Sequence, residues 1–330
     1  MTGMLLSKKF MASAGEALGA TAKRAGISPE IVDLPADGTP LPAADCARIE
    51  VAFLTRDIRF SPLYKTFGDA MVAAKNLKWV HFTSTAIDQH PFLPQLRERG
   101  VKLTTSAGTN GEPVAQTAIA GLLMLARRFP QWLDAQRRHA WEPMRGESVP
   151  ADLRGQTVMV VGLGVIGMPI ARFCQALGMH VIGIRRTPKS ANEPLDEIHP
   201  PARFGELLPS CQWLVLACPH TKETHHMLNA AMIEKLPRGA GLINVARGGV
   251  VEEQAVIAAL KSGQLGCAHL DVFEKEPLPA DSPLWDMPNL ILTPHNASAS
   301  AGNDGRAFEL FLSNLEKWAR GETLQNEQRE

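Results

Sequence analysis

Short apolar runs alternate with longer amphipathic stretches along the whole chain. In the N-terminal part these runs are rich in apolar or β-branched residues and bounded by turn residues, which is typical of parallel strands covered by helices. They predict strands over residues 4–7, 31–34, 51–55, 78–82 and 102–104. Residues 10–25 predict a helix that ends at Gly26, since glycine readily adopts the left-handed conformation of a helix C-cap. The N-terminal part is therefore expected to be an α/β unit.

The pattern restarts after a long predicted helix over residues 112–129. Six further strands are predicted over residues 157–161, 180–184, 213–217, 241–245, 267–271 and 290–292. Helical or turn segments separate them, which indicates a doubly wound dinucleotide-binding sheet. Residues 193–201 contain prolines and predict a loop, and a last helix over residues 304–320 is expected to pack on the first domain. Because 330 residues exceed the size at which a single core stops growing, two domains are expected.

Composition narrows the function classes. Lys plus Arg and Asp plus Glu both number 34, so no net charge draws the protein to nucleic acid or to an anionic membrane. No stretch approaches the roughly 20 apolar residues that a membrane helix needs. The five cysteines form no CxxC pair, which favours reduced thiols. We expect a cytoplasmic protein with a small-molecule ligand.

A glycine-rich turn follows the first strand of the second domain. It reads Gly162, Leu163, Gly164, Val165, Ile166, Gly167, and a predicted helix and a second strand come after it. In that context, backbone N–H groups at the helix N-terminus can bind a pyrophosphate, so the turn predicts dinucleotide binding.

The end of the next strand indicates which dinucleotide is bound. A carboxylate at this place would bind the ribose hydroxyls of NAD, whereas this chain has Arg185, Arg186 and Thr187. The missing acid and the added cations favour NADP(H), with NAD(H) possible; the alternative is a pair of solvated arginines on a loop.

Three polar residues follow three different predicted strands: Arg247, Glu276 and His295. A guanidinium fork can bind a carboxylate, and an imidazole beside a carboxylate can donate a proton to a developing alkoxide. Each residue alone would more often be an ordinary surface side chain, but the three together predict reduction of a 2-oxo acid. No metal site is expected, because the neighbouring His225 and His226 lack ligand spacing.

With these motifs the chain resembles the D-isomer-specific 2-hydroxyacid dehydrogenases, and its Arg-Arg-Thr-Pro at residues 185–188 is similar to the glyoxylate/hydroxypyruvate reductase branch. The resemblance implies an α/β fold of two domains, a doubly wound Rossmann-type parallel sheet plus a smaller flavodoxin-like α/β substrate domain. It implies a substrate-binding domain of residues 1–111 with 298–330, an NAD(P)-binding domain of residues 112–297, and a homodimer.

The resemblance also assigns roles to residues. It makes Arg247 the ligand of the substrate carboxylate and oxo group, His295 the proton donor and Glu276 its partner. It implies further cofactor contacts by Cys218, Pro219, Thr224, Val245, Ala246, Arg247, Asp271 and His295. It places substrate binding at Ser84, Thr85 and Ala86, together with Arg247 and His295.

Two departures from the family pattern leave the substrate open. The loop at Ser84, Thr85 and Ala86 stands where the family has a glycine-rich loop, and side chains there restrict the backbone. Gln116 stands where the family commonly has Glu. Substrate size and reaction direction in the cell therefore stay open.

The expected function is the NADPH-dependent reduction of a small, glyoxylate- or hydroxypyruvate-like 2-oxo acid to the D-2-hydroxy acid. The nicotinamide supplies the hydride and His295 the proton. The alternatives are an NAD-dependent dehydrogenase of a larger D-2-hydroxy acid and a catalytically idle, dinucleotide-sensing interaction protein.

Overall fold

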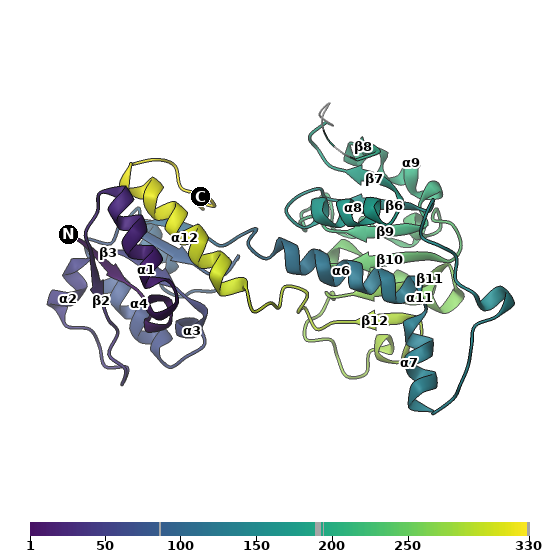
Figure 1. Ribbon diagram of the computed structural model, residues 1–330, viewed down its shortest axis with the longest axis horizontal. Helices are drawn as coiled ribbons and strands as arrows, with labels where there is room; N and C mark the ends of the chain where they lie inside the picture. Colours follow the sequence, from purple (N-terminus) through teal and green to yellow (C-terminus); the bar gives the residue numbers. More distant parts are fainter. Residues whose placement is uncertain (86, 189–192, 194, 329–330) are drawn as a thin grey trace. The chain divides into compact units, whose positions relative to one another are not determined.

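The chain folds into two compact units in the computed structural model (Figure 1), which describes residues 1–85, 87–188, 193 and 195–328. Unit 1 comprises Met1–Thr109 and Ser300–Glu330, and unit 2 comprises Asn110–Ala299. These divisions differ by two residues from the boundaries expected from the sequence. Gly111 explains the first difference: a Cβ there would lie 2.2 Å from the carbonyl oxygen of Val165, so this residue is already packed into unit 2.

The described residues of unit 1 form a five-stranded parallel sheet in the order β2-β1-β3-β4-β5. Its strands are β1 (Thr2–Leu5), β2 (Pro29–Val32), β3 (Ile49–Leu54), β4 (Trp79–Phe82) and β5 (Lys102–Thr105). This order is that of flavodoxin-like folds and confirms the predicted fold class. Strand β1 lies earlier than predicted because the Ser7 side chain accepts a hydrogen bond from Phe10 N and so caps the following helix.

Helices cover this sheet, and the last one completes its core. They are α1 (Lys8–Ala25), α2 (Ala43–Arg48), α3 (Arg56–Arg59), α4 (Leu63–Ala73), α5 (Leu93–Glu98) and α12 (Asn303–Ala319). In α12, the buried Phe311 ring stacks on Phe53 at 4.6 Å and on Trp79 at 5.2 Å between centroids. The C-terminal helix thus belongs to the N-terminal fold, as the sequence predicts.

The described residues of unit 2 form a seven-stranded parallel sheet in the order β12-β11-β10-β9-β6-β7-β8. Its strands are β6 (Thr157–Val161), β7 (His180–Ile184), β8 (Glu197–His199), β9 (Trp213–Leu216), β10 (Ala240–Asn244), β11 (Leu265–Leu270) and β12 (Leu290–Leu292). Strand β8 lies where a loop was expected, because this short edge strand is mostly polar. The order reverses between β6 and β9, and ligands of such sheets bind at the carboxyl ends of the strands at that point.

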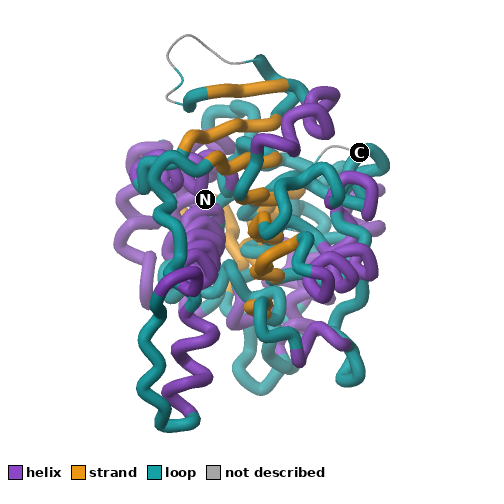
Figure 2. The backbone as a smooth tube through the Cα atoms, turned by 90° about the vertical axis from the view of Figure 1, so that its right-hand side faces the viewer, coloured by secondary structure: helices purple, strands orange, loops and turns teal. Residues whose placement is uncertain are grey.

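Apolar residues of the central strands face both ways, so the sheet of unit 2 lies between two layers of helices (Figure 2). Val158 and Val160 pack in a cluster with residues of α6 and α8, whereas Met159 and Val161 pack in the cluster on the other face. The helices are α6 (Gly111–Ala126), α7 (Phe129–Arg137), α8 (Gly167–Ala176), α9 (Phe204–Leu207), α10 (Ala230–Ile233) and α11 (Glu253–Ser262). No helix in the described part of the chain combines the length and apolar character that a membrane crossing requires.

Candidate active site

The glycine turn joins β6 to α8 at the point where the strand order reverses. Gly162 has a φ of 92°, and a Cβ on it would lie 2.7 Å from the Ala217 carbonyl oxygen. A Cβ on Gly167 would lie 1.8 Å from the carbonyl oxygen of Gly162. Around Gly164, in contrast, no heavy atom lies within 4 Å of the Cβ position. The outer glycines are thus required by the fold, and the middle one leaves room for a ligand close to the backbone.

A hollow of about 810 Å³ opens beside this turn. It brings together nine of the residues predicted to contact the cofactor: Gly162, Leu163, Gly164, Arg185, Arg186, Thr187, Cys218, Pro219 and Thr224. Phe204, Thr221, Glu223 and Met227 also line it, and sequence reasoning missed them because only the fold brings them there. Its size and its glycine-lined edge fit a dinucleotide.

The arginines at the end of β7 differ in their surroundings. The Arg185 guanidinium forms an ion pair with Glu193, and both side chains are mostly buried, at 19% and 13% exposure. Arg186 and Thr187 are exposed and line the hollow. Glu193 was not singled out from the sequence, because no motif marks it.

Arg247 lies in the turn that follows β10, and other residues of its Asn-x-x-Arg-Gly motif stabilise this turn. The Asn244 side chain accepts a hydrogen bond from Ala246 N at 3.1 Å and donates one to the Arg247 carbonyl at 3.3 Å. A Cβ on Gly248 would lie 1.9 Å from the Phe273 carbonyl, so only glycine fits there. The exposed Arg247 side chain lines a hollow of about 530 Å³ that Glu276 also lines.

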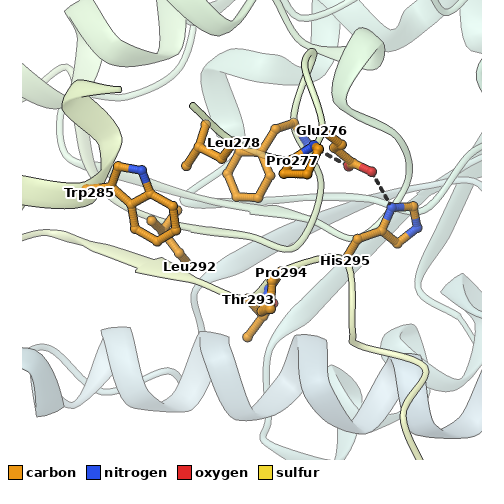
Figure 3. Close-up of a pocket in the computed structure, with 9 residues that line it drawn as sticks. Glu276, Pro277, Leu278, Trp285, Leu292, Thr293, Pro294 and His295 are labelled. Atoms are coloured by element: carbon orange, nitrogen blue, oxygen red, sulfur yellow. Dashed lines mark hydrogen bonds and ion pairs between the residues drawn. The ribbon is translucent and has the colours of Figure 1, made fainter. Parts of the chain in front are cut away.

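Glu276 and His295 form a hydrogen-bonded pair (Figure 3). The Nδ1 atom of His295 lies 2.7 Å from one carboxylate oxygen of Glu276, and Phe273 N donates to the other oxygen at 3.0 Å. The carboxylate thus occupies Nδ1 and leaves Nε2 as the atom that can reach a ligand. His295 is half-exposed, at 45% of its side chain, so its ring is open to small molecules.

The loop that carries His295 is held by Asp271. The φ of His295 is 49°, a left-handed conformation that costs a non-glycine residue about 1–2 kcal/mol. His295 N donates to the Asp271 carbonyl at 2.8 Å, and the buried Asp271 carboxylate accepts from Thr293 Oγ1, Asn296 N and Ala297 N at 2.6, 2.9 and 3.0 Å. The Asp271 carboxylate was predicted to contact the cofactor; in the structure it is engaged by this loop.

A histidine of β11 extends this network. His269 Nε2 lies 3.1 Å from Thr293 Oγ1, whose own hydrogen goes to Asp271, so the ring must donate from Nε2. Burial lowers the pKa of His269, which keeps the ring neutral. A Cβ on Gly121 of α6 would lie 2.1 Å from its Nδ1, so this glycine makes room for the ring.

An apolar cavity of about 540 Å³ adjoins the His295–Glu276 pair (Figure 3). Phe273, Leu278, Trp285 and Leu292 are among its lining residues, and the indole of Trp285 lies at the opposite end from His295. Sequence reasoning missed this cavity, because its residues are ordinary apolar side chains of separate loops.

The predicted substrate loop belongs to unit 1. Ser84 and Thr85 follow β4, and Ser106 N donates to the Ser84 carbonyl at 3.2 Å. Ala86 lies outside the described residues. Gln116 is exposed on α6 and donates to Glu112 at 3.2 Å. Within the described residues, no group of three or more His, Cys, Asp or Glu side chains is arranged to hold a metal ion.

Comparisons with known proteins identify the family. The model of the D-isomer specific 2-hydroxyacid dehydrogenase, NAD binding domain, matches residues 119–297. A glyoxylate reductase of Korarchaeum cryptofilum is 36% identical over 239 residues, covering 69% of this chain and 69% of the relative. A D-3-phosphoglycerate dehydrogenase of Archaeoglobus fulgidus is 32% identical over 263 residues, covering 79% of this chain but only 49% of the relative, so the chain spans about half of its length.

A solved structure agrees with this relationship. The NADPH-dependent glyoxylate/hydroxypyruvate reductase of Sinorhizobium meliloti, in complex with NADP and sulfate, has a TM-score of 0.72 and 27% identity, covering 99% of this chain and 98% of that one. The chain therefore belongs to the D-isomer specific 2-hydroxyacid dehydrogenase family, whose members are NAD(P)-dependent oxidoreductases. The resemblance stated from the sequence is confirmed.

Proposed function

We propose that this protein reduces a small 2-oxo acid, of the size of glyoxylate or hydroxypyruvate, to the D-2-hydroxy acid with NADPH. The observation that carries the proposal is the 2.7 Å pair of His295 and Glu276 in the same strand-end region as Arg247. The relative from Korarchaeum cryptofilum is named a glyoxylate reductase, and the Sinorhizobium meliloti protein is named as NADPH-dependent.

Three side chains divide the chemistry. Arg247 is exposed and ends in a planar fork that can bind the carboxylate and the oxo group of the substrate. The Glu276 carboxylate fixes His295 through Nδ1 and stabilises its charged form. His295 then donates the Nε2 proton to the oxygen that becomes the hydroxyl. The cofactor, when bound, would supply the hydride for the carbon of the oxo group.

The hollow beside the glycine turn would hold the cofactor. Backbone N–H groups at the start of α8 could bind its pyrophosphate, and the open space at Gly164 would allow a close approach. The exposed Arg186 and Thr187 at the end of β7 offer a cation and a hydroxyl to a 2′-phosphate. Val245 and Ala246 follow β10, and they keep their proposed role as cofactor contacts.

We also propose a ligand for each of the two units and an oligomeric state for the protein. Unit 1 would bind the substrate through the loop at Ser84 and Thr85, and unit 2 the dinucleotide. A homodimer is supported by apolar side chains exposed on α7 and the segment after it, where Trp132 is 39% and Trp141 95% exposed. Light scattering of the purified chain measures this state.

The test of the proposed function is turnover. The purified chain is assayed against a panel of 2-oxo acids of increasing size with NADPH and with NADH, next to the variant His295→Ala. The proposal requires oxidation of NADPH that depends on a small 2-oxo acid and is lost in the variant. Turnover confined to large 2-oxo acids would support the alternative of a larger substrate.

A further inference from the structure

The Arg185 guanidinium is bound within its own loop by every one of its nitrogens. Nε donates to the Thr187 carbonyl at 2.7 Å, and Nη2 donates to the Pro188 carbonyl at 2.8 Å and to the Glu193 carboxylate at 2.6 Å. Nη1 donates to the other carboxylate oxygen of Glu193. The result is a bidentate ion pair, the strongest arrangement that these two groups form.

Burial strengthens the ion pair between Arg185 and Glu193. The side chains of Arg185 and Glu193 are 19% and 13% exposed, so solvent screens their attraction less than on an open surface. A 2′-phosphate that recruits Arg185 must compete with a carboxylate already in place. The charge of Arg185 is in addition cancelled by that carboxylate at short range.

Arg186 is in a different position. It is exposed and lines the same hollow, next to the exposed Thr187, whose carbonyl is the one that Arg185 holds. A second carboxylate, Glu223, also lines the hollow; Thr221 Oγ1 donates to it at 2.6 Å, and Arg186 attracts it through space without forming an ion pair. Among the described residues that line this hollow, Arg186 is thus the cation that no carboxylate holds in an ion pair.

We propose that Arg186 reads the 2′-phosphate, and that Glu193 is a specificity residue which withholds Arg185 from it. Arg185 then stays in its own loop, where it donates to the carbonyls of Thr187 and Pro188. Glu193 sets an upper limit to the preference for NADP(H), since its removal would free a second cation. This inference deepens the proposed function, on whose choice of cofactor it rests.

The experiment measures binding without turnover. Dissociation constants of NADP⁺ and NAD⁺ are determined by calorimetry for the unmodified chain and for Arg186→Gln, Glu193→Gln, Glu223→Gln and the double variant Arg185→Gln/Glu193→Gln. We expect Arg186→Gln to reduce the preference for NADP⁺ by about 10-fold or more, the effect of one charge-assisted contact. Glu193→Gln should raise it by roughly 3- to 10-fold, with NAD⁺ affinity changed by less than about 3-fold.

Glu223→Gln is the matched control, because it removes the same charge from the same hollow without touching Arg185; Glu223 acts on Arg186 only through space, so this variant measures the effect of the lost charge alone. We expect it to change the preference by less than about 3-fold, and the double variant to stay within about 3-fold of the unmodified chain. An equal gain from Glu223→Gln, no gain from Glu193→Gln, or a loss of about 10-fold or more in the double variant overturns the inference. A chain that shows these binding shifts and reduces no 2-oxo acid would refute the proposed function alone.

Discussion

Thr293 Oγ1 donates a 2.6 Å hydrogen bond to the carboxylate of Asp271, a residue that is only 3% exposed. The same carboxylate accepts hydrogen bonds from the backbone of Asn296 and Ala297, on the far side of His295. His295 thus lies between residues that the buried Asp271 carboxylate holds by hydrogen bonds. This relationship makes Asp271 the residue that positions the proposed proton donor.

The variant Asp271→Asn tests this positioning role. An amide can keep an oxygen in the place of Oδ1, but it sets its N–H group against Ala297 N, which donates to Oδ2 at 3.1 Å, so we expect unit 2 to lose about 1.5–3 kcal/mol of stability. We expect kcat to fall by about 10-fold or more, while the dissociation constant of NADPH changes little. Thermal unfolding and steady-state kinetics measure both effects. Thr293→Val is the milder control, since it removes one of these hydrogen bonds. An intact kcat with weakened NADPH binding in Asp271→Asn would instead support the predicted contact of Asp271 with the cofactor.

Removing the proposed acid should abolish most of the rate. We expect His295→Ala to lower kcat by about 10²- to 10⁴-fold, the usual contribution of general acid catalysis, with NADPH binding and the fold retained. Glu276→Gln keeps the shape of its partner and should lower kcat less, because the ring loses its stabilising charge but keeps an acceptor at Nδ1. Near-normal turnover of His295→Ala, in a chain with unchanged circular dichroism, removes His295 from the mechanism.

Arg247→Lys separates charge from geometry. Lysine keeps the positive charge and loses the planar fork, so we expect a higher KM for the 2-oxo acid and a lower kcat together. Stability should change little because Arg247 is exposed. The motif around it, in contrast, is structural: Gly248→Ala places a Cβ against the Phe273 carbonyl and should destabilise unit 2. An unchanged kcat/KM of Arg247→Lys would make Arg247 a surface residue.

Unit 1 should be sensitive to acid. Burial lowers the pKa of His81 to about 3 and that of His90 to about 4, from an ordinary value of 6.5. At a pH below 6.5 and above the lowered pKa, the histidine binds a proton in the unfolded chain but not in the folded chain. The stability of unit 1 is therefore fully present above pH 6.5 and falls as the pH is lowered. We expect His81 alone to cost roughly 2 kcal/mol between pH 6.5 and 5.

Urea unfolding at a series of pH values, with amide exchange of β4 as the probe for unit 1, measures this loss. His81→Gln removes the titrating group and should flatten the dependence on pH, whatever it does to stability at neutral pH. Equal slopes for the variant and the unmodified chain would contradict the account of His81.

The sequence predicted those parts of the site that depend on steric or chemical necessity. Gly162 and Gly167 lie where a Cβ would collide with the backbone, so the turn requires glycine at both positions and the sequence shows it. The strand-end motifs mark Arg247, Glu276 and His295. Glu193 and Thr293 could not be found, because their roles arise from distances that the fold creates. Strand β8 was missed for another reason: a short polar edge strand has no apolar alternation to reveal it.

The most direct test of the account is the kcat/KM of the unmodified chain for a small 2-oxo acid, such as glyoxylate or hydroxypyruvate, measured with NADPH and with NADH. One charge-assisted contact from Arg186 predicts that NADPH is preferred by about 10- to 100-fold. Equal values with the two cofactors, or no oxidation of NADPH in the presence of any small 2-oxo acid, would contradict the account.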